Sequence, residues 1–200
     1  MGLPTAYMAT DTETTGASDG MRRPSNMIML SMVYENPAVT KDIPVWELPC
    51  FTAIVAHDVY VGEAYALGMN GWIFKMIGEH ERGNKTKYPV VTLSTLVTRG
   101  TEWAYKVTGG KKPQLLGQNF GSFDSRFIPQ ELLKMFHYRV LEIGSFFADP
   151  LCGAKSLAEV KKECGFGDHI SHNAWHESMD YILCMRTKYG GNVTMYDPNL

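Results

Sequence analysis

The first third of the chain is dominated by short apolar runs. These runs predict three strands, at residues 5–13, 26–35 and 47–56. The polar segment "ASDGMRRPS" between the first two is typical of a turn. Short connections of this kind favour antiparallel pairing of consecutive strands. Residues 62–79 then show helical spacing, with one face available to Ala64, Leu67, Ile73 and Met76.

From residue 90 onward, helical and strand-like patterns alternate. Residues 90–109 predict a longer helix, which Gly109-Gly110 would end. The later elements are, in chain order, a buried strand at 113–119, a mostly helical segment at 124–136 with Pro129 in a first turn, a strand at 138–149, and helices at 156–165 and 173–190. Strands first, then alternation with helices, predict an α/β fold with a mixed sheet flanked by helices.

Composition and charge narrow the class of protein. A chain of 200 residues, 44 % hydrophobic and 20 % charged, is typical of one globular domain, so we expect a single domain over residues 1–200 with an irregular tail from about residue 190. The net charge of −2 gives no overall attraction to a polyanion, but a bound divalent cation can supply positive charge locally. We interpret the basic doublets as solvated surface: Arg22-Arg23, Lys111-Lys112 and Lys161-Lys162.

The cysteines and the apolar runs bear on localisation. Cys50, Cys152, Cys164 and Cys184 are irregularly spaced, which favours reduced thiols over a disulfide framework. No apolar run approaches the length of a membrane span, and the N-terminus lacks a signal pattern. We therefore expect a cytoplasmic protein with no membrane partner.

Two carboxylates stand one residue apart in "ATDTETTG". Side chains alternate along a strand, so Asp11 and Glu13 project together while Thr10, Thr12 and Thr14 project to the other face. Like charges this close repel each other unless a cation lies between them. Carboxylate oxygens suit Mg²⁺ or Mn²⁺. A solvated strand end is the alternative, and this peptide alone does not decide between them.

Two further acidic segments stand at the ends of predicted elements. Asp124 follows a buried strand and a loop, where a helix N-cap is the common role of an aspartate. The segment "ISHNAWHESMDYI" supplies His172, His176, Glu177 and Asp180 at the head of the last helix, and the spacing of His176 and Asp180 permits a side-chain pair. Three separated acidic clusters are what a two-metal phosphoryl-transfer site needs.

The peptides "DTETTG", "NFGSFD" and "HNAWHE" resemble, in this order, the three exonuclease motifs of the DnaQ-like (DEDDh) 3′→5′ exonucleases. That superfamily includes proofreading subunits, RNase T and oligoribonuclease, and the resemblance runs from residue 5 to about residue 188. It implies a ribonuclease H-like mixed sheet, with the first three strands antiparallel and the later ones parallel. It also implies hydrolysis of single-stranded nucleic acid from a free 3′ end to nucleoside 5′-monophosphates, with two Mg²⁺ or Mn²⁺ ions and DNA favoured.

The resemblance assigns roles to the matching residues. It implies metal ligands at Asp11, Glu13 and Asp124. It also implies a general base at His172, because an imidazole side chain can transfer protons near neutral pH. The third motif departs from the family, because Glu177 stands where the family has aspartate. We expect Glu177 to complete the site because it keeps the family's spacing from His172, with Asp180 as the alternative. His169 and His176 are interpreted as surface or capping residues.

The same resemblance suggests substrate contacts. The backbone amides of Thr14 and Thr15 resemble groups that hold the terminal sugar, and Asn70 and Asn119 are further candidates. Aromatic rings near the motifs can either stack on bases or pack in the core. Stacking contributes ~1–3 kcal/mol per base to binding. These rings are Phe120, Phe123 and Trp175, and for Phe123 core packing is the more common role.

A longer stretch bears on the length of the substrate. "FHYRVLEIGSF" resembles an oligoribonuclease strand in which His137, Tyr138 and Arg139 would hold the 5′ side of a very short RNA. Against that specialisation, Phe120 and Gly144 stand where oligoribonuclease carries phosphate-holding serines. The overall pattern is nearer to compact stand-alone exonucleases of phage or bacterial type.

Three alternatives stay open at the level of sequence. An oligoribonuclease-like enzyme would act on very short RNA, and a phosphodiesterase would use the same site on a small nucleotide. A nucleic-acid-binding module on the same fold, catalytically weakened through Glu177, is the third. The sequence does not distinguish a monomer from a homodimer or from a polymerase subunit.

Overall fold

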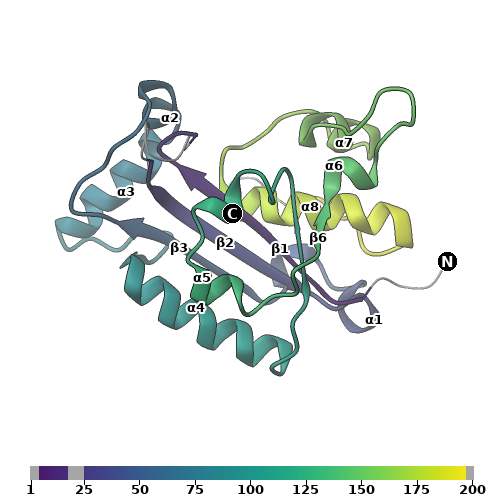
Figure 1. Cartoon of the computed structure of the whole chain (residues 1–200), viewed down its shortest axis with the longest axis horizontal. Coiled ribbons are helices and arrows are strands. Elements are labelled where there is room, and N and C mark those ends of the chain that lie inside the picture. The colour runs from purple at the N-terminus through teal and green to yellow at the C-terminus, as the bar shows by residue number, and fades with distance from the viewer. Residues whose placement is uncertain (1–4, 18–24, 197–200) are drawn as a thin grey trace.

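β1 (Tyr7–Thr14) lies inside a six-stranded mixed sheet with the strand order β4-β3-β2-β1-β5-β6 (Figure 1). The computed structural model describes residues 5–17 and 25–196. The other strands are β2 (Met27–Glu35), β3 (Cys50–Ala56), β4 (Val90–Thr92), β5 (Gln114–Gly117) and β6 (Val140–Glu142). β1, β2 and β3 pair antiparallel, whereas β4, β5 and β6 join in parallel. This confirms the expected mixed sheet.

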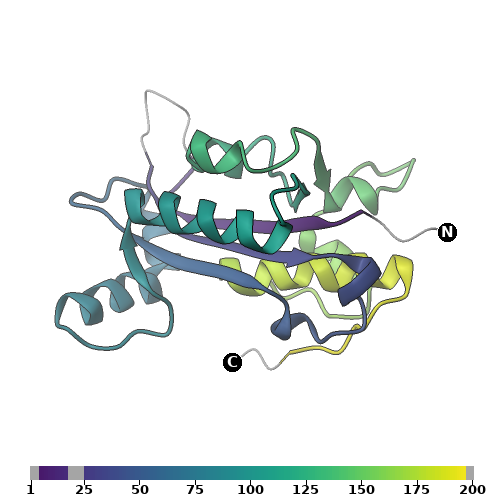
Figure 2. The same cartoon turned by 90° about the horizontal axis from the view of Figure 1, so that it is seen from below.

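Helices cover both faces of the sheet, with α4 and α5 on one side and α8 on the other (Figure 2). The α-helices are α1 (Pro37–Thr40), α2 (Ala64–Met69), α3 (Gly71–Glu81), α4 (Leu93–Thr108), α5 (Gln130–Leu133), α6 (Ile143–Phe146), α7 (Leu157–Glu163) and α8 (Ala174–Tyr189). Two 3₁₀ turns, Val45–Glu47 and Asp124–Arg126, complete the elements that the structure describes.

The alternation of side chains between the two faces of β1 determines which of them reach the site. Tyr7 and Ala9 are buried in the cluster that includes α7 and α8, whereas Met8 is buried in the cluster that includes α4 and α5. Because side chains of a strand alternate between the two faces, Asp11 and Glu13 continue the α8 side. The two acids thus extend a row of apolar side chains beneath α8.

Local sequence sets both ends of α8. Asn173 caps its start, since the side-chain oxygen accepts from the backbone N–H groups of Trp175 and His176 at 3.1 and 3.5 Å. Gly190 ends the helix in the left-handed region with φ 81°. These two caps fix which turn of α8 faces the acidic end of β1.

Residues 62–79 were expected to form one helix and instead form two. The chain breaks at Asn70, whose side chain is fully buried and donates from Nδ2 to the carbonyl oxygen of Thr14 at 3.0 Å. Helical periodicity continues through Asn70, so the break results from this long-range contact with β1. Two short helices replace the predicted one because the asparagine bonds to the strand.

The other elements needed smaller corrections. Residues 90–92, expected within a helix, form β4, because Val90 to Thr92 pair with β3 before α4 begins. The segment 124–136 divides at Pro129, which precedes α5 instead of occupying its first turn. Of the expected strand 138–149, only β6 pairs with β5, and α6 follows directly. The connection from β2 to β3 is longer than expected and contains α1.

Some sequence interpretations fall on residues that the structure does not describe. The Arg22-Arg23 doublet, most of the predicted turn at 17–25, and the end of the tail lie outside the described residues. Residues 191–196 have neither helix nor strand, in line with the expected irregular tail. Of the helices in residues 5–17 and 25–196, none combines the length and apolar character that crossing a membrane requires.

A buried ion pair joins α8 to the sheet near the C-terminal end of the helix. Arg186 and Glu35 are both fully buried, and Nη2 of Arg186 lies 2.9 Å from Oε1 of Glu35. Arg186 also donates to the backbone carbonyls of Thr40, Ile43 and Asn192. The hydroxyl of Tyr7 donates to the same carboxylate at 3.1 Å. Every charge in this group therefore has partners.

We predict that Arg186→Met destabilises the protein strongly. Removing one member of a buried pair leaves an uncompensated charge on Glu35, which costs about 3–5 kcal/mol. Urea denaturation would measure the change in the free energy of unfolding. Arg99→Met, at an exposed position of α4, is the control and should change stability by less than about 0.5 kcal/mol. Equal effects of the two substitutions would contradict this prediction.

Candidate active site

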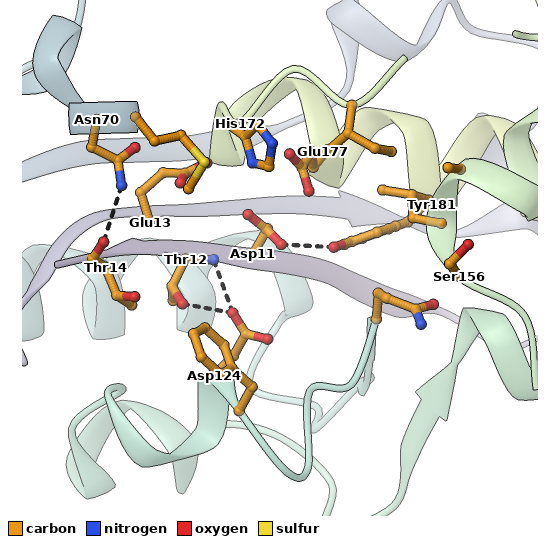
Figure 3. Close-up of a pocket in the computed structure, with 16 residues that line it drawn as sticks. Asp11, Thr12, Glu13, Thr14, Asn70, Asp124, Ser156, His172, Glu177 and Tyr181 are labelled. Carbon is orange, nitrogen blue, oxygen red and sulfur yellow. Dashed lines mark hydrogen bonds between the residues drawn. The ribbon is translucent and has the colours of Figure 1, made fainter. Parts of the chain in front are cut away.

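A cavity of about 300 Å³ opens between the end of β1 and the first turns of α8. Segments distant in sequence meet there (Figure 3). Its lining includes eight residues that the sequence singled out: Asp11, Glu13, Thr14, Asn70, Phe123, Asp124, His172 and Glu177. The remaining lining residues are Thr12, Met69, Gln118, Ser156, Leu157, Ala158, Ile170 and Tyr181.

Asp11 and Glu13 lie on β1, both less than a tenth exposed. The hydroxyl of Tyr181, from the second turn of α8, donates to Oδ1 of Asp11 at 2.6 Å (Figure 3). Burial, followed by the negative charges of Glu177 and Asp124, raises the pKa of Asp11 well above its usual value. The same causes raise the pKa of Glu13 to about 8.

Asp124 reaches the cavity from the loop after β5. β1 runs past its last β5 partner, so the backbone N–H of Thr12 donates to Oδ1 of Asp124 at 3.1 Å instead of to a strand. The hydroxyl of Thr12 donates to the same oxygen at 2.6 Å. Burial raises the pKa of Asp124 to about 6, while these hydrogen bonds oppose the rise. Asp124 is therefore held against the edge of β1 by neutral donors.

His172 and Glu177 come from either side of the α8 N-terminus. His172 is exposed and has a φ of 47°, a left-handed conformation that costs a non-glycine residue about 1–3 kcal/mol. Glu177 is half-buried on the first turn of α8 and faces the cavity beside His172 and Asp11 (Figure 3). Burial, followed by the charge of Asp180, raises the pKa of Glu177 to about 7.

The cavity acids differ from the other buried acids in their partners. Glu35 is paired with Arg186 and Asp180 with Lys161. In the described part of the chain, no lysine or arginine lies within ion-pair distance of the cavity acids Asp11, Glu13, Asp124 and Glu177. Their hydrogen-bond donors are hydroxyl, amide and backbone groups. Within the described ranges, the site thus gathers carboxylates that no lysine or arginine contacts directly.

The donor set fits divalent cations in its chemistry. Clustered carboxylate oxygens are ligands for Mg²⁺ or Mn²⁺, and a cation would remove the repulsion that raises these pKa values. Asn70 adds a buried side-chain oxygen, Oδ1, without a hydrogen-bond partner. Within the described residues, no group of three or more His, Cys, Asp and Glu side chains is arranged so that it could hold a metal ion as it stands.

Several predicted substrate contacts lie away from the cavity. Phe120 is only 1 % exposed and packs in the core beside α4 and α5, so its proposed stacking on bases is corrected to core packing. The backbone N–H of Thr15 donates to the carbonyl of Asn26 at 2.9 Å, which leaves it unavailable to a terminal sugar. Asn119 lines a separate, smaller cavity with Glu142. Trp175 is half-buried and packs edge-on against Tyr88.

The remaining candidates for the 5′ side of a short RNA lie in the loop before β6. His137 stacks on Tyr138, with ring centroids 4.5 Å apart, and Arg139 lies over the Tyr138 ring. His137 and Tyr138 line a different cavity from that of the carboxylates. The structure therefore places this group apart from the acidic site.

Asp180, the alternative ligand, does not line the cavity. It is 1 % exposed and pairs with Lys161, whose Nζ lies 2.5 Å from Oδ2. The spacing of His176 and Asp180 had allowed a side-chain pair, but Asp180 is occupied by Lys161 and by the hydroxyl of Tyr196. His176, interpreted from the sequence as a surface or capping residue, is instead buried. Burial, followed by the charges of Lys87 and Lys161, lowers its pKa to about 4. Glu177, not Asp180, faces the carboxylates of β1.

Sequence reasoning missed the residues that support the site. Tyr181 had a usable signal, because it lies four residues after Glu177 on the same helix face. Thr12 was assigned to the opposite face of β1, which is correct, but its hydrogen bonds to Asp124 depend on the end of β5. Gln118 and the start of α7 line the cavity through tertiary packing alone.

Several solved structures of nucleases are similar to this chain. No protein-family model matches the chain, and no curated protein matches it in sequence. Escherichia coli exonuclease I in complex with a dT13 oligonucleotide is similar in structure, with a TM-score of 0.61 and 11 % identity over 94 % of this chain. This chain spans 42 % of exonuclease I.

Two smaller nucleases are also similar. The nuclease domain of 3′hExo, a DEDDh family member bound to rAMP, gives a TM-score of 0.56 and 14 % identity over 96 % of both chains. Cell-death related nuclease 4 (CRN-4) gives a TM-score of 0.59 and 12 % identity, over 93 % of this chain and 64 % of that one. The chain therefore shares its fold, a mixed sheet flanked by helices, with these nucleases, one of which is a DEDDh family member.

Proposed function

We propose that this protein is a metal-dependent 3′→5′ exonuclease that hydrolyses single-stranded nucleic acid to nucleoside 5′-monophosphates. One observation carries the proposal: on an exonuclease fold, a single cavity gathers four carboxylates beside an exposed histidine, and none of them forms an ion pair with a lysine or arginine among residues 5–17 and 25–196. A phosphodiester needs positive charge near its oxygens and a base near the attacking water. The carboxylates could bind metal ions, which supply the positive charge, and the histidine is suited to be the base.

Each residue has a distinct part in this mechanism. Asp11, Glu13, Asp124 and Glu177 would hold two Mg²⁺ or Mn²⁺ ions. Such ions lower the pKa of a water molecule and stabilise a leaving 3′-oxygen. An imidazole nitrogen of His172 accepts a proton from the attacking water as its oxygen bonds to phosphorus. The bond from phosphorus to the 3′-oxygen breaks, and that oxygen leaves as an alcohol after gaining a proton. Tyr181 orients the Asp11 carboxylate.

The substrate is proposed from the cavity and from the structural neighbours. Thr14, Asn70 and Phe123 line the space beside the acids, so they are the side chains that a terminal nucleotide would meet. Exonuclease I has been observed with single-stranded oligonucleotides, and 3′hExo with rAMP. We favour DNA, and chain-length profiling with matched DNA and RNA oligonucleotides tests this choice. Activity confined to dinucleotides would instead support the oligoribonuclease-like alternative.

A second candidate is a nucleic-acid-binding module without turnover. It is favoured by the position of Asp124, one of whose oxygens already accepts two hydrogen bonds from Thr12. The longer Glu177 side chain in place of aspartate points the same way. Such a module would bind single strands equally with Mg²⁺ and with a chelator, and it would leave them intact.

We predict that Asp11→Asn abolishes hydrolysis. The substitution keeps the size of the side chain but removes a charge that the metal site needs, so the rate should fall by about 10³-fold or more. Release of mononucleotides from a 3′-labelled single strand, with Mg²⁺, Mn²⁺ or chelator, would measure it. Asp58→Asn, in an exposed loop, should keep full activity. Full activity of Asp11→Asn would reject the proposed site.

We predict that His172→Ala lowers turnover without weakening binding. Loss of a general base costs about 10²–10⁴-fold in rate, whereas the carboxylates are untouched. Single-turnover rates and the Kd for a single-stranded oligonucleotide, measured with Ca²⁺ in place of Mg²⁺, separate the two effects. His80→Ala, at an exposed position on the last turn of α3, serves as the control. An unchanged rate would assign the base to another group.

We predict that the metal-free protein loses stability as the pH rises. The pKa values of Glu13, Asp124 and Glu177 are raised to about 8, 6 and 7 in the folded protein, against about 4 when unfolded. Between these limits the folded state holds more protons than the unfolded state. Stability is therefore highest near pH 4–5 and falls, on the order of a few kcal/mol, toward pH 8.

Thermal unfolding in chelator at pH 5, 6, 7 and 8 measures this trend. Mg²⁺ should raise Tm more at pH 8 than at pH 5, because the deprotonated acids bind it better. Glu13→Gln removes one of the titrating groups and should flatten the pH dependence. A metal-free Tm that is constant or rises between pH 5 and pH 8 would contradict the electrostatic description of the site.

A further inference from the structure

The segment that carries His172 has no secondary structure of its own. Residues 164–173 connect α7 to α8 without a helix or a strand. Within this segment, Ile170 and His172 line the cavity, and His172 adopts its left-handed conformation. A strained residue in an irregular segment keeps one position only if neighbouring contacts fix it. The contacts of the buried side chain of Lys161 supply such a constraint.

Lys161 lies on α7 and is only 5 % exposed, so the interpretation of the Lys161-Lys162 doublet as solvated surface holds for Lys162 and is wrong for Lys161. Its ammonium nitrogen donates to the backbone carbonyl of His169 at 2.7 Å and to Oδ2 of Asp180 at 2.5 Å. A lysine is rarely buried unless its charge is paired. Here one ammonium group joins three segments: α7, the segment before His172, and α8.

Asp180 is a firm anchor for this ammonium. It is 1 % exposed, and the hydroxyl of Tyr196 lies 3.0 Å from its second oxygen, Oδ1. The Tyr196 hydroxyl also lies 3.2 Å from the carbonyl oxygen of His176. Both oxygens of Asp180 are thus occupied, one by α7 and one by the C-terminal segment. This arrangement uses the carboxylate for packing and leaves it outside the cavity.

The three joined segments all contribute to the cavity wall. Ser156, Leu157 and Ala158 lie just before and at the start of α7. The connecting segment supplies Ile170 and His172, and α8 supplies Glu177 and Tyr181. The ammonium of Lys161 therefore lies behind the wall that holds the imidazole. It does not line the cavity itself.

A contribution to stability alone does not explain why Lys161 pairs with Asp180 and also bonds to the His169 carbonyl. Buried ion pairs often add little net stability, because desolvation offsets their attraction, but they can define one geometry. The hydrogen bond to the His169 carbonyl holds the backbone three residues before His172. A change in the course of the backbone at that position would move the imidazole. The pair with Asp180 fixes where the ammonium sits.

We propose that Lys161 is a positioning residue, which holds residues 169–172 against Asp180 so that the imidazole of His172 stays beside the carboxylates of β1. This rests on the proposed function, since it takes His172 as the general base. Lys161 does not line the cavity, so it would act through His172.

Lys161→Met is the direct test, with Lys162→Met as its matched control on the exposed side of α7. A displacement of a catalytic group by about 1 Å costs roughly 10²-fold in rate, so we expect kcat of Lys161→Met to fall about 10- to 100-fold. KM and the Kd for a single strand should change by less than about threefold. Lys162→Met should behave as wild type.

A double-mutant cycle tests whether Lys161 acts through His172. In a His172→Ala background, Lys161→Met should cause no further loss of kcat, because the group that it positions is gone. Equal losses in both backgrounds would overturn the proposal. Lys161→Met combined with Asp180→Asn removes both charges and leaves no buried charge unpaired, but the donor to the His169 carbonyl is still missing. We expect this double variant to recover stability and to keep the low kcat; recovery of kcat would overturn the proposal.

An activity-independent measurement separates this inference from the proposed function. Amide hydrogen exchange should become at least about tenfold faster in residues 164–173 of Lys161→Met, with α8 still protected, and should be unchanged in Lys162→Met. Unchanged exchange in Lys161→Met would overturn the proposed restraint. If the wild-type protein hydrolyses no oligonucleotide, the proposed function fails, whereas the exchange result still decides whether Lys161 holds the segment.

Discussion

Repulsion between buried carboxylates at the end of β1 is the constraint on which the site depends. Asp11 and Glu13 continue a face of the strand that is otherwise apolar, and Asp124 and Glu177 bring two more acids to the same cavity. Elsewhere the protein compensates its buried acids with cations, as for Glu35. Among the described residues, the cavity acids have neutral hydrogen-bond donors in place of such cations, so bound cations would relieve their mutual repulsion.

Helix α8 transmits this constraint to the rest of the molecule. Its C-terminal half is fixed to β2 by Arg186 and its middle to α7 by Asp180. At the cavity itself, the hydroxyl of Tyr181 donates to Asp11 of β1. Sliding of the helix along the sheet would break all three contacts at once. The position of Glu177 relative to β1 is therefore set by these three contacts, two of which lie outside the cavity.

The sequence predicted the sheet, the strand-end acids and the cavity histidine, because each depends on local alternation or on a motif. It missed features that depend on distant partners. Asn70 breaks a helix because it bonds to the backbone of β1, and β4 exists because it pairs with β3. Phe120 lies in the loop after β5 yet is buried, since it packs in the cluster that includes α4 and α5. The role of Lys161 likewise became visible only from its partners.

The choice between Glu177 and Asp180 illustrates how packing decides chemistry. Both acids lie in the N-terminal half of α8, and the shorter aspartate would match the family in residue type. Both oxygens of Asp180 are engaged, however, so turning this carboxylate toward the cavity would leave the buried ammonium of Lys161 without its partner. The cavity is left with Glu177, whose extra methylene lets the carboxylate reach across from a helix held in place by other contacts. Replacing that glutamate with aspartate would shorten the reach while the helix stayed fixed, so the residue type and the docking of α8 have to be understood together.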